Sequence, residues 1–497
     1  MIEQMAFRFG LPAALVSAVV SSWKKILMKT HPPRSFVCLA VYRNLSDHQA
    51  LKLLSRAVLL ITIFASVTPR LLWAGGIYRD GAGARSLSLG GASVAQPNLA
   101  LEALQANPAG LSTIKTPQAQ IGLGIVNADG KFSNSANTDA NIDDGFGIWP
   151  EAAIAFPIGT TPITVGLGFV PDAALGGEWN YVDAPGGLGG TTSYGFQEHR
   201  SEITALRSAL GASWQITESL SIGAGLGAVF NQNRLHAPYT FQSYPSLVGG
   251  GQGFKTLLDL KTDGFGVNGT FGLLYRVCEQ VSFGLSYQTP TKIRSKGDAN
   301  GNAGMQLDNL FGPGVPPDFH YDAEVQNVFP QMISAGLSWQ INDRVRTIFQ
   351  VDWINWADAF DELEVYLNNG NNAAINGVLG TPNIYDVIPL RWEDQFVYRL
   401  GLEFQATESV ALRAGYTYGK NPVPDSTLNP MTAAIMEHKI SVGAGWKSDR
   451  YSVDAGYQYS LPAEQSVGPS ALRSGEYSNS HTKVDVHMFA VTFGVNF

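Results

Sequence analysis

The stretch MISAGLSWQI, residues 332–341, alternates apolar residues with small or polar ones along its whole length. The apolar set is Ile333, Ala335, Leu337, Trp339 and Ile341. Successive side chains of a β-strand point to opposite faces, so a period of two predicts a strand with one apolar face. The same alternation begins again at residues 220, 281, 400, 410, 440 and 453. The sequence therefore predicts many strands of this kind.

The connections between these strands alternate between short and long. Short polar turns such as QITESL and QINDRV are followed by long segments rich in Gly, Pro and Asn. The long segments are roughly residues 232–257, 297–320, 361–388, 421–433 and 461–480. Outer-membrane barrels of bacteria combine short periplasmic turns with long extracellular loops, and hydrocarbon forces every strand edge to pair. The sequence predicts an all-β fold, a transmembrane antiparallel β-barrel of about fourteen strands, with residues 117–497 forming the barrel.

Composition agrees with this class, since the chain has 54 glycines and only 15% charged residues among its 497. Residues 57–67, AVLLITIFASV, form an apolar run behind Lys52 and Arg56, the layout of a secretory signal. We expect a leader of residues 1–74 that is removed after Ala74. The remaining chain is acidic, which argues against a nucleic-acid partner.

The stretch ALEALQANPAGLSTI, residues 100–114, differs from the strands around it because it reads as a short helix ended by Asn107 before Pro108. A compact piece between a leader and a barrel has little room except in the lumen. We therefore expect residues 75–116 to form an N-terminal hatch, or plug, of short helices in the lumen.

Several segments, in order, resemble the outer-membrane long-chain fatty acid transporter (FadL) family, which includes aromatic-hydrocarbon uptake channels. They are GARSLSLGGASVA, NPAGL, FQVDWINWADAF, PLRWEDQFVYRLGLEF, LRAGYTYGKNPVPDSTLNP and YSVDAGYQY. The resemblance implies a fourteen-stranded barrel, a hatch carrying the motif Asn107, Pro108 and Ala109, and a monomer. One departure is in QPNLALEALQA, residues 96–106, just upstream of this motif, where many relatives have acidic residues and this chain has one, Glu102.

Ligand-binding residues are predicted from apolar side chains in the long loops. These are Phe254, Leu257, Leu258, Leu310 and Phe311. In the family, the corresponding loops form a surface groove that captures the ligand. The alternative is that the loops pack on one another.

Strand parity places a set of charged residues in the lumen, where each could also simply form salt bridges. They are Arg207, Arg346, Asp352, Arg391, Arg399, Glu403, Arg413, Lys439 and Asp454. A guanidinium suits a carboxylate, and Arg391 and Arg399 are the predicted ligand-binding arginines. Gly168 and Pro171 mark a predicted lateral opening, because the family has a wall kink there and proline lacks a ladder donor. An ordinary strand end at Pro171 is the alternative.

No catalytic residue, metal site or cofactor is predicted, because HExxH, GxSxG and P-loop patterns are absent and Cys278 would be the one cysteine after the leader. The expected function is passive outer-membrane transport of hydrophobic compounds, first of all long-chain fatty acids, in a Gram-negative cell. Loop capture, internal binding, hatch movement and lateral release are its expected steps. Expected partners are fatty acids or aromatic hydrocarbons, outer-membrane lipid and the barrel assembly machinery. A general porin and a lipid-acting barrel enzyme are the rival functions.

Overall fold

The computed structural model describes residues 80–243, 253–473 and 476–497. The expected leader, its cleavage site and the first residues of the expected hatch lie outside the described residues. All statements below concern the described part of the chain.

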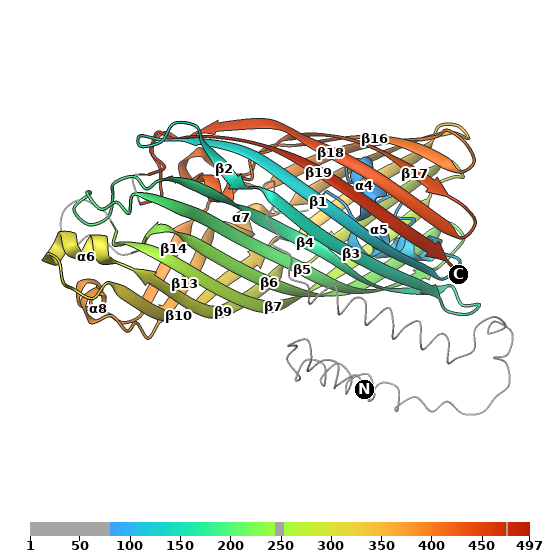
Figure 1. Cartoon of the computed structure of the whole chain (residues 1–497). Helices are drawn as coiled ribbons and strands as arrows, with labels where there is room; N and C mark the ends of the chain where they lie inside the picture. The colour runs from blue at the N-terminus through green and yellow to red at the C-terminus, as the bar shows by residue number, and fades with distance from the viewer. Residues whose placement is uncertain (1–79, 244–252, 474–475) are drawn as a thin grey trace, which may run out of the picture. The chain divides into compact units, whose positions relative to one another are not determined.

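A single antiparallel sheet closes on itself to form a barrel (Figure 1). Closure is made by β1 (Gln118–Ser133), which pairs with β19 (His481–Asn496) along its whole length. The other strands are β2 (Ala140–Asp144), β3 (Phe146–Pro157), β4 (Ile163–Val182), β5 (Phe196–Gln215), β6 (Leu220–Thr240), β7 (Lys255–Arg276), β8 (Val281–Gln288), β9 (Thr291–Asn302), β10 (Asp318–Phe329), β11 (Met332–Gln340), β12 (Val345–Ile354), β13 (Glu362–Asn368), β14 (Ile384–Pro389), β15 (Gln395–Gln405), β16 (Val410–Gly419), β17 (His438–Lys447) and β18 (Tyr451–Ser466).

The nineteen strand segments of the described residues build a barrel of 14 strands, as the sequence predicts. Five barrel strands each consist of two consecutive segments: β2 with β3, β8 with β9, β10 with β11, β12 with β13, and β14 with β15. Two of these interruptions fall at Pro290 and Pro330. Proline has no N–H to donate to the ladder, so the strand breaks there and resumes within two residues.

The outer face of the barrel is apolar. In β11, Ile333 and Leu337 are 40% and 44% exposed, whereas the alternate residues Ser334 and Ser338 are each only 4% exposed. Hydrophobic side chains that face outward at this density fit a hydrocarbon environment rather than water. Trp214, Trp339 and Trp446 are all exposed on this face.

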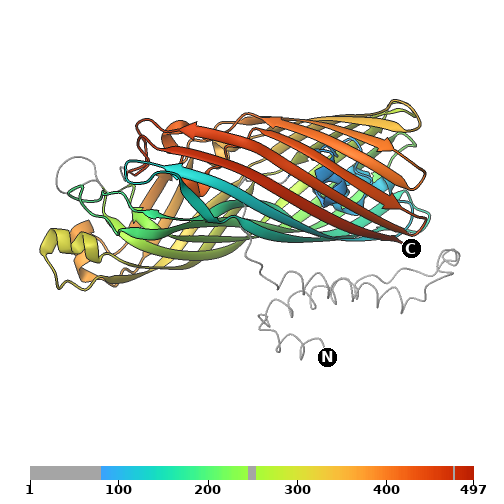
Figure 2. The same cartoon turned by 45° about the horizontal axis from the view of Figure 1, so that its top comes forward.

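The two ends of the barrel differ. At one end, which also holds the C-terminus, tight turns such as 216–219 and 341–344 join the strands (Figures 1 and 2). The opposite end carries α6 (Gly304–Phe311) and α8 (Ala373–Leu379). α7 (Trp356–Ala359) lies in the interruption between β12 and β13, and η3 (Asp425–Thr427) and η4 (Pro430–Thr432) lie in the connection between β16 and β17. No described helix has both the length and the apolarity to span a bilayer.

Much of what the sequence analysis assigned to long loops is strand. β6 continues to Thr240 and β7 begins at Lys255, so most of 232–257 belongs to the barrel wall. Likewise β9 extends to Asn302 and β18 to Ser466. The prediction was wrong here because Gly, Asn and Pro weaken the strand signal, whereas pairing between long neighbouring strands outweighs that local preference.

The N-terminal residues 80–116, called the hatch segment below, lie inside the barrel (Figure 2). Their elements are α4 (Gly83–Ser88), α5 (Ala100–Gln105) and the 3₁₀ helix η2 (Pro108–Thr113). α4 packs on β17, β18 and β19, and η2 packs on β5, β6 and β7. The wall offers glycines at these contacts: a Cβ on Gly443 would lie 2.4 Å from Ser88 Cβ, and one on Gly456 2.5 Å from the Ala84 carbonyl oxygen. The absence of side chains there lets the segment fit.

Candidate functional site

Asn107 joins the hatch segment to the barrel wall. Its side chain is fully buried and its Nδ2 donates to the carbonyl oxygens of Val94 (2.8 Å) and Leu273 (3.0 Å), the latter on β7. Its Oδ1 accepts from the N–H of Ala109 (3.1 Å) and so caps η2, with Pro108 in the first position of that helix. The residue was expected to end a helix, but α5 ends at Gln105 and Asn107 begins the next one.

Two groups of buried ion pairs also hold the hatch segment. In the first, Asp80 accepts from Arg399 Nη1 (3.0 Å) and from Lys439, both on the wall. Arg399 Nε donates in turn to Asp352 (2.6 Å), and its Nη1 also reaches the Gly90 carbonyl oxygen (2.9 Å). With two carboxylates and a carbonyl as partners, Arg399 is already occupied.

The second group centres on Arg85 of α4. Its Nη1 donates to both carboxylate oxygens of Glu102 (2.9 Å each), and its Nε donates to Glu403 on β15 (3.2 Å). Glu403 also accepts from Arg413 (2.8 Å), which pairs with Asp454 (2.7 Å). Glu102, the single acidic residue of the stretch 96–106, is therefore fully buried and has its charge paired.

Arg391 is not placed as the sequence predicted. It lies between β14 and β15, outside any strand, with a left-handed backbone (φ 52°) and an exposed side chain. The strand pattern failed because the interruption between these segments was not recognised. Strand parity has no meaning for a residue in such a bend.

β4 contains a break in its ladder toward the preceding barrel strand. The β3 pairing ends at Phe169, and pairing with β2 resumes only at Glu178 and Trp179. On its other side, β4 stays paired with β5 but shifts register between Pro171 and Ala173. The predicted Gly168 lies just before the break and Pro171 lies within it. Buried side chains, including Ala174 and Leu175, fill it.

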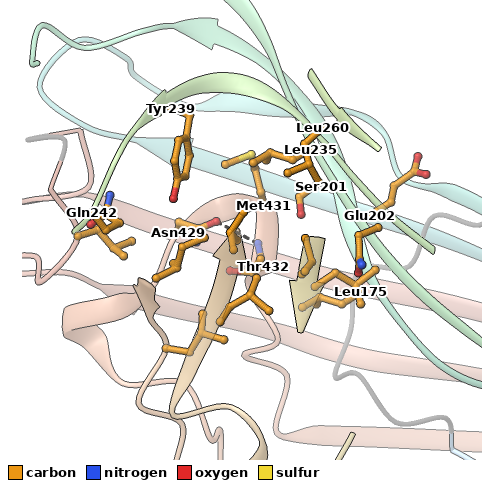
Figure 3. Close-up of a pocket in the computed structure, with 18 of the residues that line it drawn as sticks. Leu175, Ser201, Glu202, Leu235, Tyr239, Gln242, Leu260, Asn429, Met431 and Thr432 are labelled. Atoms are coloured by element: carbon orange, nitrogen blue, oxygen red, sulfur yellow. Dashed lines mark hydrogen bonds between the residues drawn. The ribbon is translucent and has the colours of Figure 1, made fainter. Parts of the chain in front are cut away.

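A cavity of about 140 Å³ lies beside this break (Figure 3). Its wall is mainly apolar and comes from strands distant in sequence, for example Leu175 of β4, Leu260 of β7 and Val325 of β10. Met431 and Thr432, from the connection before β17, also line the cavity and are labelled in Figure 3 together with Leu175 and Leu260. A second, smaller cavity of about 40 Å³ adjoins Asp80 and Arg399.

The predicted ligand-binding apolar residues do not line either cavity. Phe254 and Leu258 are buried in a separate apolar cluster at the loop end, with Leu257 beside Leu258 on β7. Leu310 and Phe311 lie on α6, where Phe311 is 59% exposed. Cavity residues such as Leu175 were missed, although the sequence PDAALGG, 171–177, carries a signal: proline and paired glycines inside a strand mark an irregularity.

The chain was compared with known proteins. Residues 70–497 match the family model described as outer membrane protein transport protein (OMPP1/FadL/TodX). A Pseudomonas aeruginosa FadL homologue has a similar structure (TM-score 0.68, 16% identity), and so does the Pseudomonas putida toluene transporter TodX (TM-score 0.67, 21% identity). Each comparison covers 85% of this chain and 100% of the other.

Among curated sequences, the chain is similar to alkane uptake protein A of Marinobacter nauticus, with 26% identity over 181 residues. That match covers 34% of this chain and 36% of the relative, so it spans about a third of the relative's length. The family model, in contrast, covers the whole described part of the chain. The protein therefore belongs to the outer membrane protein transport protein (OMPP1/FadL/TodX) family, whose members are transport channels rather than enzymes.

Proposed function

We propose that this protein carries hydrophobic compounds passively from the cell exterior, through the cavity, and sideways through the β4 break into the outer membrane. The observation that carries this proposal is the position of Leu175. It lies in the part of β4 without a partner on the β3 side, and it lines the cavity. A ligand in the cavity is therefore separated from the lipid by side chains, with no backbone ladder between them.

Lateral release suits the physical chemistry of an apolar ligand. Burial of each CH₂ is favourable by about 0.8 kcal/mol, so leaving an apolar cavity for water is unfavourable and leaving it for lipid is not. The hatch segment also closes the axial route, since its buried ion pairs and Asn107 fasten it to the wall. A general porin has the opposite requirement, a continuous aqueous path.

Two ligand classes are candidates. Long-chain fatty acids are the first, as the family resemblance implies. Monoaromatic hydrocarbons are the second, favoured by the size of the cavity, because an engineered apolar cavity of about 150 Å³ in another protein binds benzene. Similarity to the toluene transporter TodX and to an alkane uptake protein supports hydrophobic cargo in general.

Gating and capture complete the proposal. α6 presents Met305 and Phe311 at the loop end, where they offer a first contact for a hydrophobic ligand. Movement of the hatch segment on ligand binding requires Asp80 or Arg85 to release a wall partner. The protein acts as a monomer and is inserted into the outer membrane by the barrel assembly machinery.

Filling the break tests this route. Leu175→Trp adds bulk between cavity and lipid, and uptake of radiolabelled oleate and toluene by whole cells is expected to fall at least tenfold at normal surface level. Leu226→Trp, on the exposed outer face, is the matched control and should not change uptake. Unchanged uptake in Leu175→Trp refutes lateral release. Steady ion conductance of the purified protein in planar bilayers, with no ligand binding, indicates a porin instead.

A further inference from the structure

Three side chains of metal-ligating type meet at the loop end of the barrel. Asp183 directly follows β4, His199 lies near the start of β5, and Glu476 lies shortly before β19. One nitrogen or oxygen atom from each lies within 4.8 Å of those from the other two. All three side chains are buried, with exposed fractions of 1% or less. One imidazole and two carboxylates, brought together from distant parts of the chain, are the kind of ligand set that zinc uses in proteins.

The ring of His199 is held as a metal ligand is held. Its Nδ1 lies 3.1 Å from the carbonyl oxygen of Gln197. A carbonyl oxygen can only accept, so Nδ1 carries a proton and donates it. Tyr181 stacks on the ring, with 3.5 Å between the ring centroids. In the neutral ring Nε2 then presents a lone pair, and it has no hydrogen-bond partner among the described residues. Metal-ligating histidines are oriented by the same bond from the other ring nitrogen.

The lone pair of Nε2 faces a carboxylate, since Glu476 Oε1 lies 3.3 Å away. A shared proton would make a charge-assisted hydrogen bond, which is nearly straight and about 2.7–2.9 Å long. The observed contact is longer and lacks the geometry of a hydrogen bond. A metal ion does not lie on the line between its ligands: with bonds of about 2.0–2.1 Å, two ligand atoms of a tetrahedral zinc are roughly 3.3 Å apart. The separation therefore favours a metal ion over a proton.

Asp183 is oriented by its own partners and can still accept a metal. Its Oδ1 accepts from Lys255 Nζ (2.5 Å), and its Oδ2 accepts from the N–H of Tyr194 (2.8 Å). Lys255 Nζ also donates to the Ala184 carbonyl oxygen (2.7 Å), so it has a second acceptor of its own. A carboxylate offers about four lone-pair positions, and these two bonds use about half of them. The presence of an imidazole selects zinc over calcium, which prefers oxygen ligands.

We propose that Asp183, His199 and Glu476 bind one Zn²⁺ ion, with a water molecule in the remaining tetrahedral position. Glu476 and the next residue, Tyr477, line the cavity, whereas Asp183 and His199 belong to the β4–β5 side of the barrel. The ion ties this part of the cavity wall to those strands and stabilises the loop end. The site goes beyond the proposed transport function and does not depend on which compound is carried.

The experiment measures zinc binding by the full-length protein, purified in detergent without a histidine tag and stripped of metal with a chelator. Calorimetry at neutral pH with Zn²⁺ is expected to give one tight site per chain, and with Ca²⁺ none. His199→Gln and Glu476→Gln are each expected to weaken Zn²⁺ binding at least tenfold. Zn²⁺ should also raise the temperature at which the wild-type barrel loses its folded gel mobility, and should raise it less in these variants.

His320→Gln is the matched control, because His320 also lies beside two carboxylates, at 3.9 Å from each, but is 41% exposed. It should keep the tight zinc site. Zinc affinity equal to the wild type in both His199→Gln and Glu476→Gln overturns the proposal, and if only one of them folds, that one decides.

A wild type that binds no zinc also overturns the metal site. In that case, a midpoint temperature that falls as the pH rises through the pKa of histidine, in the wild type but not in His199→Gln, assigns a shared proton to the pair instead. Failure of zinc binding leaves uptake of hydrophobic compounds untouched, so the proposed transport function is judged separately by the Leu175→Trp experiment.

Discussion

Asp80 of the hatch segment and Arg399 of the barrel wall form a buried ion pair, 3.0 Å from Oδ1 to Nη1, although 319 residues separate them in the chain. The pair crosses the boundary between the two parts of the molecule that must move relative to each other if the hatch opens. Its carboxylate is shared with Lys439, and its guanidinium with Asp352. Buried ion pairs, as well as side-chain packing, therefore hold the hatch segment in the lumen.

Removal of the Asp80 charge should loosen the hatch segment. Asp80→Asn leaves Lys439 without its carboxylate, and loss of one partner of a buried pair typically costs about 3–5 kcal/mol. We expect brief open events in planar-bilayer recordings and greater sensitivity of cells to large antibiotics. Glu393→Gln, which breaks an exposed pair with Lys420, is the control and should leave both unchanged. A silent Asp80→Asn channel contradicts this electrostatic role.

Loss of the Asn107 side chain should loosen the hatch segment and impair uptake. Asn107→Ala removes two hydrogen bonds to carbonyl groups and the cap of η2, each worth about 1 kcal/mol, and leaves buried acceptors unpaired. Uptake of a labelled hydrophobic compound is the measurement, with surface level checked by cell-surface labelling. Normal uptake at normal surface level shows that the motif is only a turn.

Small residues in the wall should be required where the hatch segment touches it. A Cβ on Gly272 would lie 2.0 Å from Asn107 Oδ1, whereas one on Gly269 of the same strand would meet nothing closer than 3.4 Å. Gly272→Ala should therefore displace η2 and destabilise by about 1–3 kcal/mol. The readout is the temperature at which the folded barrel loses its characteristic gel mobility. Gly269→Ala should match the wild type, and equal temperatures for both variants disprove the contact.

A charged side chain on the outer face should lower the free energy of unfolding in a bilayer. Leu337→Arg places a cation on the lipid-facing side of β11, at a cost of about 2–4 kcal/mol if it lies near the bilayer midplane. Urea unfolding of the protein in lipid vesicles measures this loss. Ser338→Ala, on the luminal side of the same strand, should change the unfolding free energy by well under half of that. Similar losses from both would mean that the two faces of β11 were assigned incorrectly.

Period-two alternation was sufficient to predict the barrel, its strand number and its lipid-facing residues, because the bilayer imposes the same simple rule on every strand. Short turns such as 341–344 were likewise visible, since polar residues stand between two clear strands. Both features depend on neighbours in the sequence. They are therefore the features that a single sequence expresses best.

The cavity and the ion pairs could not be predicted in the same way. Leu175, Leu260 and Val325 meet only because the sheet has closed, and nothing local marks them as neighbours. The partners of Arg399 come from the hatch segment and from β12, so its occupation was invisible from strand parity. Arg391 was misassigned for a different reason, since a bend between two strand segments reset the alternation.

The contact between α4 and the strands β17, β18 and β19 constrains the sequence of events in assembly. These strands come at the end of the chain, and β19 completes the ring by pairing with β1. The surface that receives α4 does not exist until the final strands have been inserted. α4 is the first described helix to be synthesised, yet it can dock only after nearly all of the chain that follows it has been inserted.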